Sequence, residues 1–331
     1  MSHGNALTPF FIFGSPRSGT SLLSRMIDSH EQLVVPNESL IFKMFSSFIH
    51  CYGDLSQLEN QSVLLRDILA TRVIGYWQPK PDFETVLSLI KRPGFAGVIE
   101  ALICSTAIDK KLKAWGEKSP GHVFYWNEIK REFPEAKVIH IVRDGRDVAS
   151  SIINARMGPK TYYAAAQMWR DYLAQIEIIK QDCAADRFLE VRYESLLANP
   201  QDNLQGICTL LGVAYSDSML NFFEKDTNYQ TDKTNLENLR KPLIADNQEK
   251  WRKNLSVEDL QEFETVAGDF LSRFGYTIAN KLDPLPAAKL NYLKYLKSPA
   301  IRFVSRAKDV QGHKEFLSIE RIKLKRKFNR L

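Results

Sequence analysis

The chain has 331 residues, and its content of 44% hydrophobic and 11% aromatic residues excludes a disordered chain. Its 30 Gly and Pro residues are too few for a collagenous chain. Its four cysteines are far apart and its six histidines form no H-x-x-x-H pair, which excludes a disulfide framework and the common zinc motifs. The net charge of +6 arises at the end of the chain, because residues 289–331 carry 13 Lys or Arg and three Asp or Glu.

The first predicted element is a buried strand at Phe10–Phe13, a short apolar run. A polar loop bounded by Gly14 and Gly19 follows it, and apolar residues at helical spacing then predict a helix from about Gly19 to His30. A strand, a glycine-bounded loop and a helix in this order are typical of the start of a βαβ unit.

Residues 39–111 have an irregular helical pattern without a clear strand, which predicts a helical cap inserted between strands. Glycines and prolines divide the cap into helices near residues 41–49, 63–74, 85–90 and 96–108. A short strand near 113–117 and a helix over 121–132, which Pro134 ends, complete this part of the chain.

A second clear strand is predicted at Lys137–Val142, with a helix through Ile153 after it. Further on, the pattern predicts a long helix, a strand, two short helices around Pro200 and a helix that Ser256 and Asp259 cap. These elements are expected at residues 161–182, 187–191, 193–198, 203–211 and 255–274. Strands that alternate with helices indicate an α/β fold with a parallel sheet covered on both faces.

The loop from Gly14 to Gly19 has the spacing of a Walker A phosphate loop. The unpaired amides at the start of the following helix would bind phosphate oxygens. Thr20 stands where an ATPase or kinase has lysine, so the ammonium that reaches the β- and γ-phosphates is missing. Arg17 is the nearest cation, and its planar fork suits a phosphate or sulfonate. The alternative is an ordinary turn between strand and helix.

A second candidate anion site is Arg143, at the end of the strand 137–142, with Ser151 on the next helix. Ligands of open α/β sheets lie beyond the carboxyl ends of the strands, where both side chains are expected. The alternative is that Arg143, Asp144, Arg146 and Asp147 pair with one another on a solvated turn.

Together, the segments Pro16–Thr20 and Val142–Arg146 with Ser151 resemble the two signature segments of sulfotransferases that use 3′-phosphoadenosine 5′-phosphosulfate (PAPS). The resemblance implies a fold like that of a P-loop nucleotide kinase and a reaction without a metal ion. It also implies that the first loop, with Arg17, Ser18, Gly19, Thr20 and Ser21, holds the 5′-phosphosulfate. Arg143 and Ser151 would then hold the 3′-phosphate.

The match is closest to the branch with tyrosylprotein and glycan sulfotransferases. By that resemblance Glu38, 21 residues after Arg17, is the general base, and Lys118 is a catalytic lysine that acts with Arg17 on the sulfonate and the leaving oxygen. The alternatives are that Glu38 caps the next helix, that Lys118 is a surface lysine, or that His122 is the base.

Later segments resemble the adenine side of the same family. Tyr193 lies in one of them, and Lys241 and Lys250 lie in a late nucleotide-binding loop. Family members have a serine shortly before the Lys-Pro pair, where this chain has Thr234 and Asn235, so that contact is not expected here.

The resemblance predicts a sulfotransferase domain over residues 1–280, which transfers a sulfuryl group in line from PAPS to an acceptor hydroxyl or amine. The acceptor class stays open among tyrosine, glycan, lipid and small-molecule compounds. Two alternatives remain, a P-loop kinase-like phosphotransferase that uses ATP and a non-catalytic nucleotide-binding protein at a membrane.

Residues 281–331 are predicted to form a basic amphipathic tail. Apolar residues alternate there with Lys and Arg, so residues 289–331 could lie on an anionic membrane or pack loosely on the domain. The chain has no signal peptide pattern and no apolar stretch near the roughly 18 residues that span a bilayer. We therefore expect a cytoplasmic protein, peripheral to the inner membrane surface at most, and without nucleic acid as partner.

Overall fold

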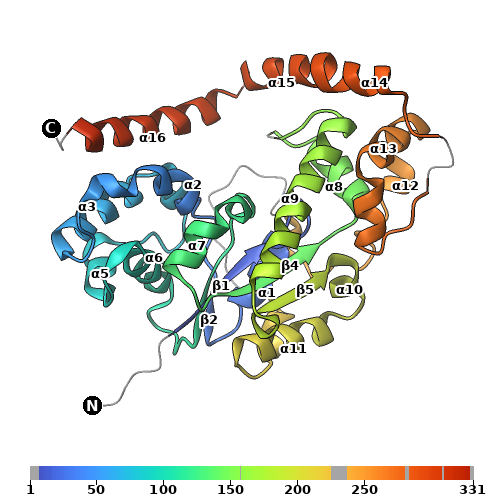
Figure 1. The fold of residues 1–331 in the computed structure, drawn as a ribbon. Coiled ribbons are helices and arrows are strands. Elements are labelled where there is room, and N and C mark those ends of the chain that lie inside the picture. The colour runs from blue at the N-terminus through green and yellow to red at the C-terminus, as the bar shows by residue number, and fades with distance from the viewer. Residues whose placement is uncertain (1–6, 157, 225–236, 280–282, 308, 329–331) are drawn as a thin grey trace.

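The structure, a computed structural model, describes residues 7–156, 158–224, 237–279, 283–307 and 309–328. Its centre is a five-stranded parallel sheet in the order β2-β3-β1-β4-β5 (Figure 1). The strands are β1 (Thr8–Phe13), β2 (Leu33–Val34), β3 (Ala114–Glu117), β4 (Lys137–Val142) and β5 (Phe188–Arg192). The predicted α/β fold with a parallel sheet is therefore confirmed.

Helices occupy the connections between the strands and the chain after β5. Between β1 and β3 they are α1 (Thr20–Asp28), α2 (Ile41–Phe45), η1 (Ser46–Tyr52), α3 (Leu58–Leu69), α4 (Arg72–Gly75), α5 (Phe83–Leu89), α6 (Gly94–Cys104) and η2 (Ser105–Ala107). From β3 to β5 they are η3 (Pro120–Tyr125), α7 (Trp126–Glu132), α8 (Gly145–Ile152), α9 (Tyr162–Asp182) and η4 (Ala185–Arg187). After β5 come α10 (Tyr193–Ala198), α11 (Pro200–Leu211), η5 (Asp217–Met219), η6 (Glu237–Arg240), α12 (Trp251–Asn254) and α13 (Val257–Arg273).

Strand β1 lies at the centre of the sheet and is buried on both faces, as its apolar run predicted. Phe11 and Phe13 pack with the cap helices, α7 and α9, whereas Phe10 and Ile12 face α1, α10 and α11. Successive side chains of a strand point to opposite faces, so four consecutive apolar residues supply two separate core clusters.

The cap is helical, as predicted, and lies between β2 and β3. It shares one apolar cluster with the sheet, since Phe42 packs edge-on against Phe11 with 6.1 Å between the ring centroids. The capping box of Ser256 and Asp259 at the start of α13 is also confirmed. Strand β2 was not predicted, because two residues are too few to give a periodic pattern.

The parallel register brings the two predicted anion segments to one edge of the sheet. Phe13 of β1 lies opposite His140 of β4, so the glycine loop after β1 and Arg143 after β4 leave the sheet side by side. The chain turns from β1 toward β2 on one side and from β4 toward β5 on the other. This reversal is where open α/β sheets bind their ligands.

The last part of the chain forms a helical arm, which we define as residues 287–328. It consists of α14 (Ala287–Tyr292), the π-helical turn η7 (Leu293–Lys297), α15 (Ser298–Ala307) and α16 (Val310–Phe328). The arm runs along one side of the molecule, from the end near α13 to the end near α2 and α3 (Figure 1).

Candidate functional site

The loop from Gly14 to Gly19 passes so close to its neighbours that side chains at its two glycines would clash. A Cβ on Gly14 would lie 2.6 Å from the Ile141 carbonyl oxygen, and one on Gly19 would lie 2.4 Å from the Tyr193 ring. Gly19 also has a φ of +95°, which favours glycine. Within the loop, the Ser15 and Ser18 hydroxyls share a buried hydrogen bond of 2.9 Å, which helps to fix the turn.

The start of α1 has the properties of an anion-binding helix terminus. Gly19 provides no side-chain cap, and the first turn contains no acidic residue. The amides there carry a partial positive charge, so they attract an anion that approaches along the loop. Thr20 is buried at this position and Ser21 is half-buried beside it.

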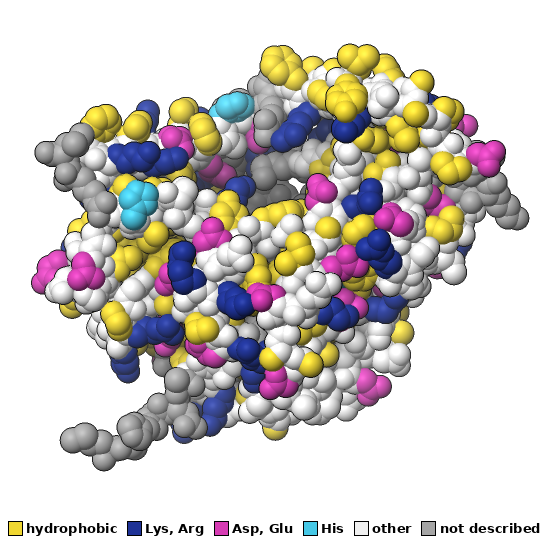
Figure 2. Space-filling view, in the orientation of Figure 1, with side chains coloured by type: hydrophobic (Ala, Val, Ile, Leu, Met, Phe, Trp, Pro, Cys, Tyr) yellow, Lys and Arg dark blue, Asp and Glu magenta, His cyan; other side chains and the backbone are white. Residues whose placement is uncertain are grey.

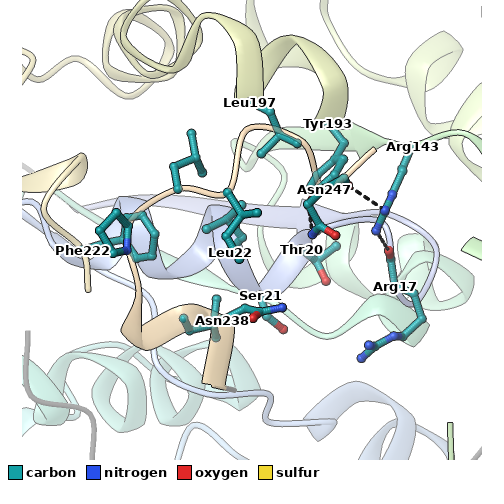
Figure 3. Close-up of a pocket in the computed structure, with 15 residues that line it drawn as sticks. Arg17, Thr20, Ser21, Leu22, Arg143, Tyr193, Leu197, Phe222, Asn238 and Asn247 are labelled. Carbon is teal, nitrogen blue, oxygen red and sulfur yellow. Dashed lines mark hydrogen bonds between the residues drawn. The ribbon is translucent and has the colours of Figure 1, made fainter. Parts of the chain in front are cut away.

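Arg143 lies against the loop and is held from several sides (Figure 3). It donates hydrogen bonds to the carbonyl oxygens of Arg17, at 3.3 Å, and Asn247, at 2.9 Å. Its guanidinium carbon lies 4.4 Å from the centroid of the Tyr193 ring, and Asp147 is 3.5 Å away. These contacts fix the plane of the guanidinium at the pocket wall.

Arg17 joins the two anion segments directly, since its Nε donates to the Ser151 hydroxyl at 2.9 Å. Its φ is positive, at 74°, which is uncommon outside glycine. Burial, and next the charge of Arg143, hold the pKa of Arg17 below its usual value. Two guanidinium groups that disfavour each other's charge favour an anion between or beside them.

A pocket opens beside these residues, with polar groups at one end and apolar groups at the other (Figure 3). It encloses about 810 Å³ of space, including the part that is open to solvent. The polar end is formed by residues 17, 19–21 and 143. The apolar residues that line it are Leu22, Tyr193, Leu197, Phe222, Leu239, Pro242, Leu243 and Ile244.

Asn247 belongs to this pocket and was not predicted from the sequence. Its amide donates to the Tyr193 hydroxyl at 2.7 Å while its carbonyl oxygen accepts from Arg143. No motif surrounds Asn247 in the sequence, so only its position six residues after Lys241 could have indicated it.

Lys241 and Lys250 were predicted to bind the nucleotide. In the structure both side chains are exposed and neither lines the pocket. The loop between them does reach it, through Pro242 and Asn247. Thr234 and Asn235 lie outside the residues that the structure describes.

Glu38 and Lys118, which are 80 positions apart, form an ion pair of 2.8 Å. The Lys118 ammonium also donates to the Ser21 hydroxyl at 3.2 Å, so it bridges the start of α1 and the Glu38 carboxylate. Lys118 is only 3% exposed, whereas the Glu38 side chain is 39% exposed. The pair therefore combines a fixed cation with a carboxylate that solvent or a second substrate can reach.

A buried network below this pair fixes its backbone. The Glu117 carboxylate accepts from the hydroxyls of Ser39, at 2.7 Å, and Ser119, at 2.5 Å, and binds the His122 ring at 2.8 Å. The Ser119 oxygen in turn accepts from the amides of Ser39 and Leu40. Burial opposes ionisation of Glu117, but His122 and the two hydroxyls outweigh it and hold its pKa below the usual value.

His122 is therefore not placed to act as the base. It is fully buried, packs against the Phe42 ring in a T-shaped arrangement, and uses Nδ1 for Glu117. The alternative in which His122 replaces Glu38 is wrong for this reason.

Tyr172 and Trp77 lie close to Glu38 and were not predicted as site residues. The Trp77 indole donates to the Glu38 carbonyl oxygen at 3.1 Å. Burial, and next the charge of Glu38, raise the pKa of Tyr172 to about 12, so this hydroxyl keeps its proton. Tyr172 comes from α9 and Trp77 from the cap, which are far apart in the sequence.

Of the charged residues near Arg143, some form ion pairs in the interior and do not reach the pocket. Arg146 pairs with Asp144 at 2.7 Å and with Glu264 at 2.6 Å, and it is buried. The expected pairing is present for Asp144 with Arg146 and for Arg143 with Asp147. All four residues are buried, however, so the expected solvated turn is wrong, and Arg143 also lines the pocket. Within the described ranges, no group of three His, Cys, Asp or Glu could hold a metal ion.

Residues 9–217 match the sequence profile of the family described as "Sulfotransferase family". A protein-tyrosine sulfotransferase of Drosophila melanogaster is 22% identical over 285 residues, which cover 83% of this chain and 53% of that protein. Protein-tyrosine sulfotransferase A of Caenorhabditis elegans is 23% identical over 291 residues, which cover 82% of this chain and 68% of the relative. The chain thus spans about half to two thirds of these relatives' length.

Among solved structures, the fold is similar to the sulfotransferase domain of the Synechococcus PCC 7002 olefin synthase. The TM-score is 0.57 and the sequence identity is 25%, with 84% of this chain and 98% of that domain covered. The similarity therefore extends over most of this chain and nearly all of that domain.

Proposed function

The chain belongs to the sulfotransferase family, and from this premise we propose that it transfers a sulfuryl group from PAPS to an acceptor hydroxyl or amine. PAPS supplies the sulfuryl group together with a phosphate leaving group. Some of the residues described above would hold this donor, and others would act on the proton of the acceptor.

The residues of the pocket fit a nucleotide with phosphates at both the 3′ and 5′ positions. The uncapped start of α1, with Thr20 and Ser21, would hold the 5′-phosphosulfate. Arg143, which lines the pocket, and Ser151, which accepts a hydrogen bond from Arg17 beside it, would hold the 3′-phosphate. Tyr193 with its apolar neighbours would contact the adenine ring. Two cationic side chains, Arg17 and Arg143, lie at the polar end of this pocket, and a nucleotide with two phosphates would bring a partner for each.

The observation that carries the proposal is the hydrogen bond from Arg17 to Ser151. It joins the loop after β1 to the helix after β4, so one molecule can contact both anion-binding segments. Had the two segments lain on opposite faces of the sheet, no single bisphosphate nucleotide could have reached both of them.

Glu38 would be the general base that accepts the proton of the acceptor hydroxyl, a role that contributes roughly 10²–10⁴-fold to the rate. Lys118 and Arg17 would stabilise the charge that develops on the sulfonate and on the leaving oxygen during in-line transfer. The burial of Lys118 supports this role, because a cation that is already desolvated and fixed needs no rearrangement during the reaction.

The acceptor would approach the region around Glu38, to which the cap contributes Trp77 and α9 contributes Tyr172. Tyrosine, glycan, lipid and small-molecule hydroxyls all suit a carboxylate base. The similarity to protein-tyrosine sulfotransferases favours a tyrosine-like hydroxyl among these classes.

The test is a transfer assay with radiolabelled PAPS against one member of each acceptor class. A parallel binding measurement compares 3′-phosphoadenosine 5′-phosphate (PAP), 5′-AMP and ATP with Mg²⁺. We expect tight binding of PAP, weak binding of 5′-AMP and no turnover of ATP. Preference for ATP with Mg²⁺-dependent turnover would instead support the kinase alternative.

A further inference from the structure

We propose that the outer face of the helical arm, residues 287–328, docks on an anionic lipid surface. Along most of its length the arm leaves large apolar side chains in contact with water. This proposal concerns a surface away from the nucleotide pocket and does not depend on the transfer reaction.

The exposed apolar side chains of the arm lie at helical spacing, in stripes. In the first half, Tyr292, Leu296 and Phe303 are separated by four and seven residues and are 53%, 63% and 76% exposed. In α16, Leu317, Leu324 and Phe328 are separated by seven and four residues and are 54%, 51% and 67% exposed. Residues at these separations share one face of a helix, so each half of the arm presents several large apolar side chains along one face.

The opposite face of the arm is bound to the rest of the molecule at both ends. Near α13, Leu293 packs with Tyr163 and Leu285, and the Ser298 hydroxyl lies 2.9 Å from that of Thr161. These contacts hold the first half of the arm against α9.

At the other end, Arg326 forms a two-pronged ion pair with Asp67 of α3, at 2.5 and 2.8 Å. Ile319 and Ile322 pack against the apolar cluster of the cap. These contacts fix the orientation of the arm between α9 and the cap. Its outer apolar side chains therefore cannot turn inward to pack in the core.

Cations lie beside the apolar side chains of the arm, and their charge favours an anionic lipid surface as the binding partner. Lys294, Arg302, Arg321, Lys325 and Lys327 are all exposed on the arm. Figure 2 shows hydrophobic and basic side chains side by side along this edge of the molecule. An apolar stripe flanked by cations is the pattern of helices that lie in the interface of an anionic membrane.

A second copy of this chain would fit the face less well. Two arms facing each other would bring together two surfaces with a net charge of +10 over residues 289–331, and this repulsion opposes pairing. No helix among the described residues is long and apolar enough to cross a membrane.

The test is co-sedimentation of the full chain with phosphatidylcholine vesicles that do or do not contain phosphatidylglycerol. We expect binding to the anionic vesicles only, and weaker binding in high salt because salt screens the charges. The stripe variant combines Leu317→Ser, Leu324→Ser and Phe328→Ser, and should bind at least tenfold more weakly. Its matched control combines Ile108→Ser and Val257→Ser, which remove apolar side chains 64% and 60% exposed elsewhere on the surface.

Circular dichroism and PAP binding confirm that each variant is folded, and sedimentation equilibrium measures the oligomeric state. Equal binding by the stripe variant and the full chain would overturn the proposal, as would no binding of the full chain to anionic vesicles. A dimer that the stripe variant converts to a monomer, without vesicle binding, would assign the face to a second copy instead. The vesicle result is independent of whether PAPS is the donor.

Discussion

The Lys118 ammonium lies 2.8 Å from the Glu38 carboxylate, with the ammonium buried and the carboxylate accessible. Ser21, at the start of α1, is the second partner of the same ammonium. The pair thus connects the phosphate loop to the place where an acceptor would lose its proton.

Replacing Glu38 should stop turnover without weakening the binding of the donor. We expect Glu38→Gln to lower kcat by roughly 10²–10⁴-fold, because the amide cannot accept the acceptor's proton. The affinity for PAP should be unchanged, since Glu38 does not line the nucleotide pocket. Glu59→Gln, at an exposed carboxylate of α3, is the control. Full sulfation by Glu38→Gln would remove this residue from the mechanism.

Lys118 and Glu38 should behave as one unit in a double-mutant cycle. We expect Lys118→Met alone to lower kcat by roughly 10²–10³-fold, through the loss of charge stabilisation. Because the two groups contact each other, the double variant should lose much less than the product of the single losses. The measurement is kcat for the four proteins, and losses that multiply would show that the groups act independently.

Arg143 should discriminate the nucleotide with the 3′-phosphate from the nucleotide without it. Charged hydrogen bonds contribute about 1.5–3 kcal/mol, so Arg143→Ala should weaken PAP binding by roughly 10- to 150-fold and 5′-AMP binding much less. Calorimetric titration of both nucleotides measures this difference. The half-buried Arg170, which pairs with Asp269 away from the pocket, supplies the control variant Arg170→Ala. An equal loss for both nucleotides would mean that Arg143 only supports the loop, through the Arg17 carbonyl.

Gly19→Ala should displace Tyr193 and reduce nucleotide affinity. The new Cβ would lie 2.4 Å from the Tyr193 ring, which forms a wall of the pocket. Gly212→Ala is the matched control, because Gly212 also has a positive φ, of 75°, but has nothing within 4 Å of its Cβ position. Both variants should lose about 1 kcal/mol of stability from the backbone conformation, and only Gly19→Ala should also lose affinity for PAP in titration. Equal PAP affinity in the two variants would contradict the role of the contact between Gly19 and Tyr193.

Glu117 should contribute to stability at neutral pH and lose this contribution in acid. Its pKa is lower in the folded protein than the usual 4.5, so the unfolded chain binds its proton first. Stability from this group is present above pH 4.5 and falls as the pH drops through the lower folded pKa. Glu117→Gln should cost roughly 1–3 kcal/mol at pH 7, because the amide leaves buried donors unpaired.

Glu117→Gln should also reduce the loss of unfolding free energy between pH 7 and pH 4. Urea unfolding of Glu117→Gln and of the unchanged protein at pH 7 and pH 4 measures this difference. If the two proteins lose the same stability between these pH values, Glu117 does not control the acid response.

The sequence by itself determined the features that depend on local pattern. Four of the five strands, the glycine loop, most helix positions and the capping box at Ser256 follow from periodicity and from residue types at short spacing. The positions of Arg17 and Arg143 at the ends of two buried strands were sufficient to place both anion segments at one edge of the sheet. Strand β2 was missed because two residues give no period.

The tertiary structure decided which of these residues meet. The hydrogen bond from Arg17 to Ser151 depends on the parallel register of β1 and β4, and Lys118 reaches Glu38 only because β3 is paired between β1 and β2. Packing placed Asn247 in the pocket and Tyr172 near Glu38, although neither was predicted. Lys241 and Lys250 lie outside the pocket, and His122 is buried in the core. Side-chain direction in loops and helix ends is set by packing between distant segments, and no spacing within one segment of the sequence encodes it.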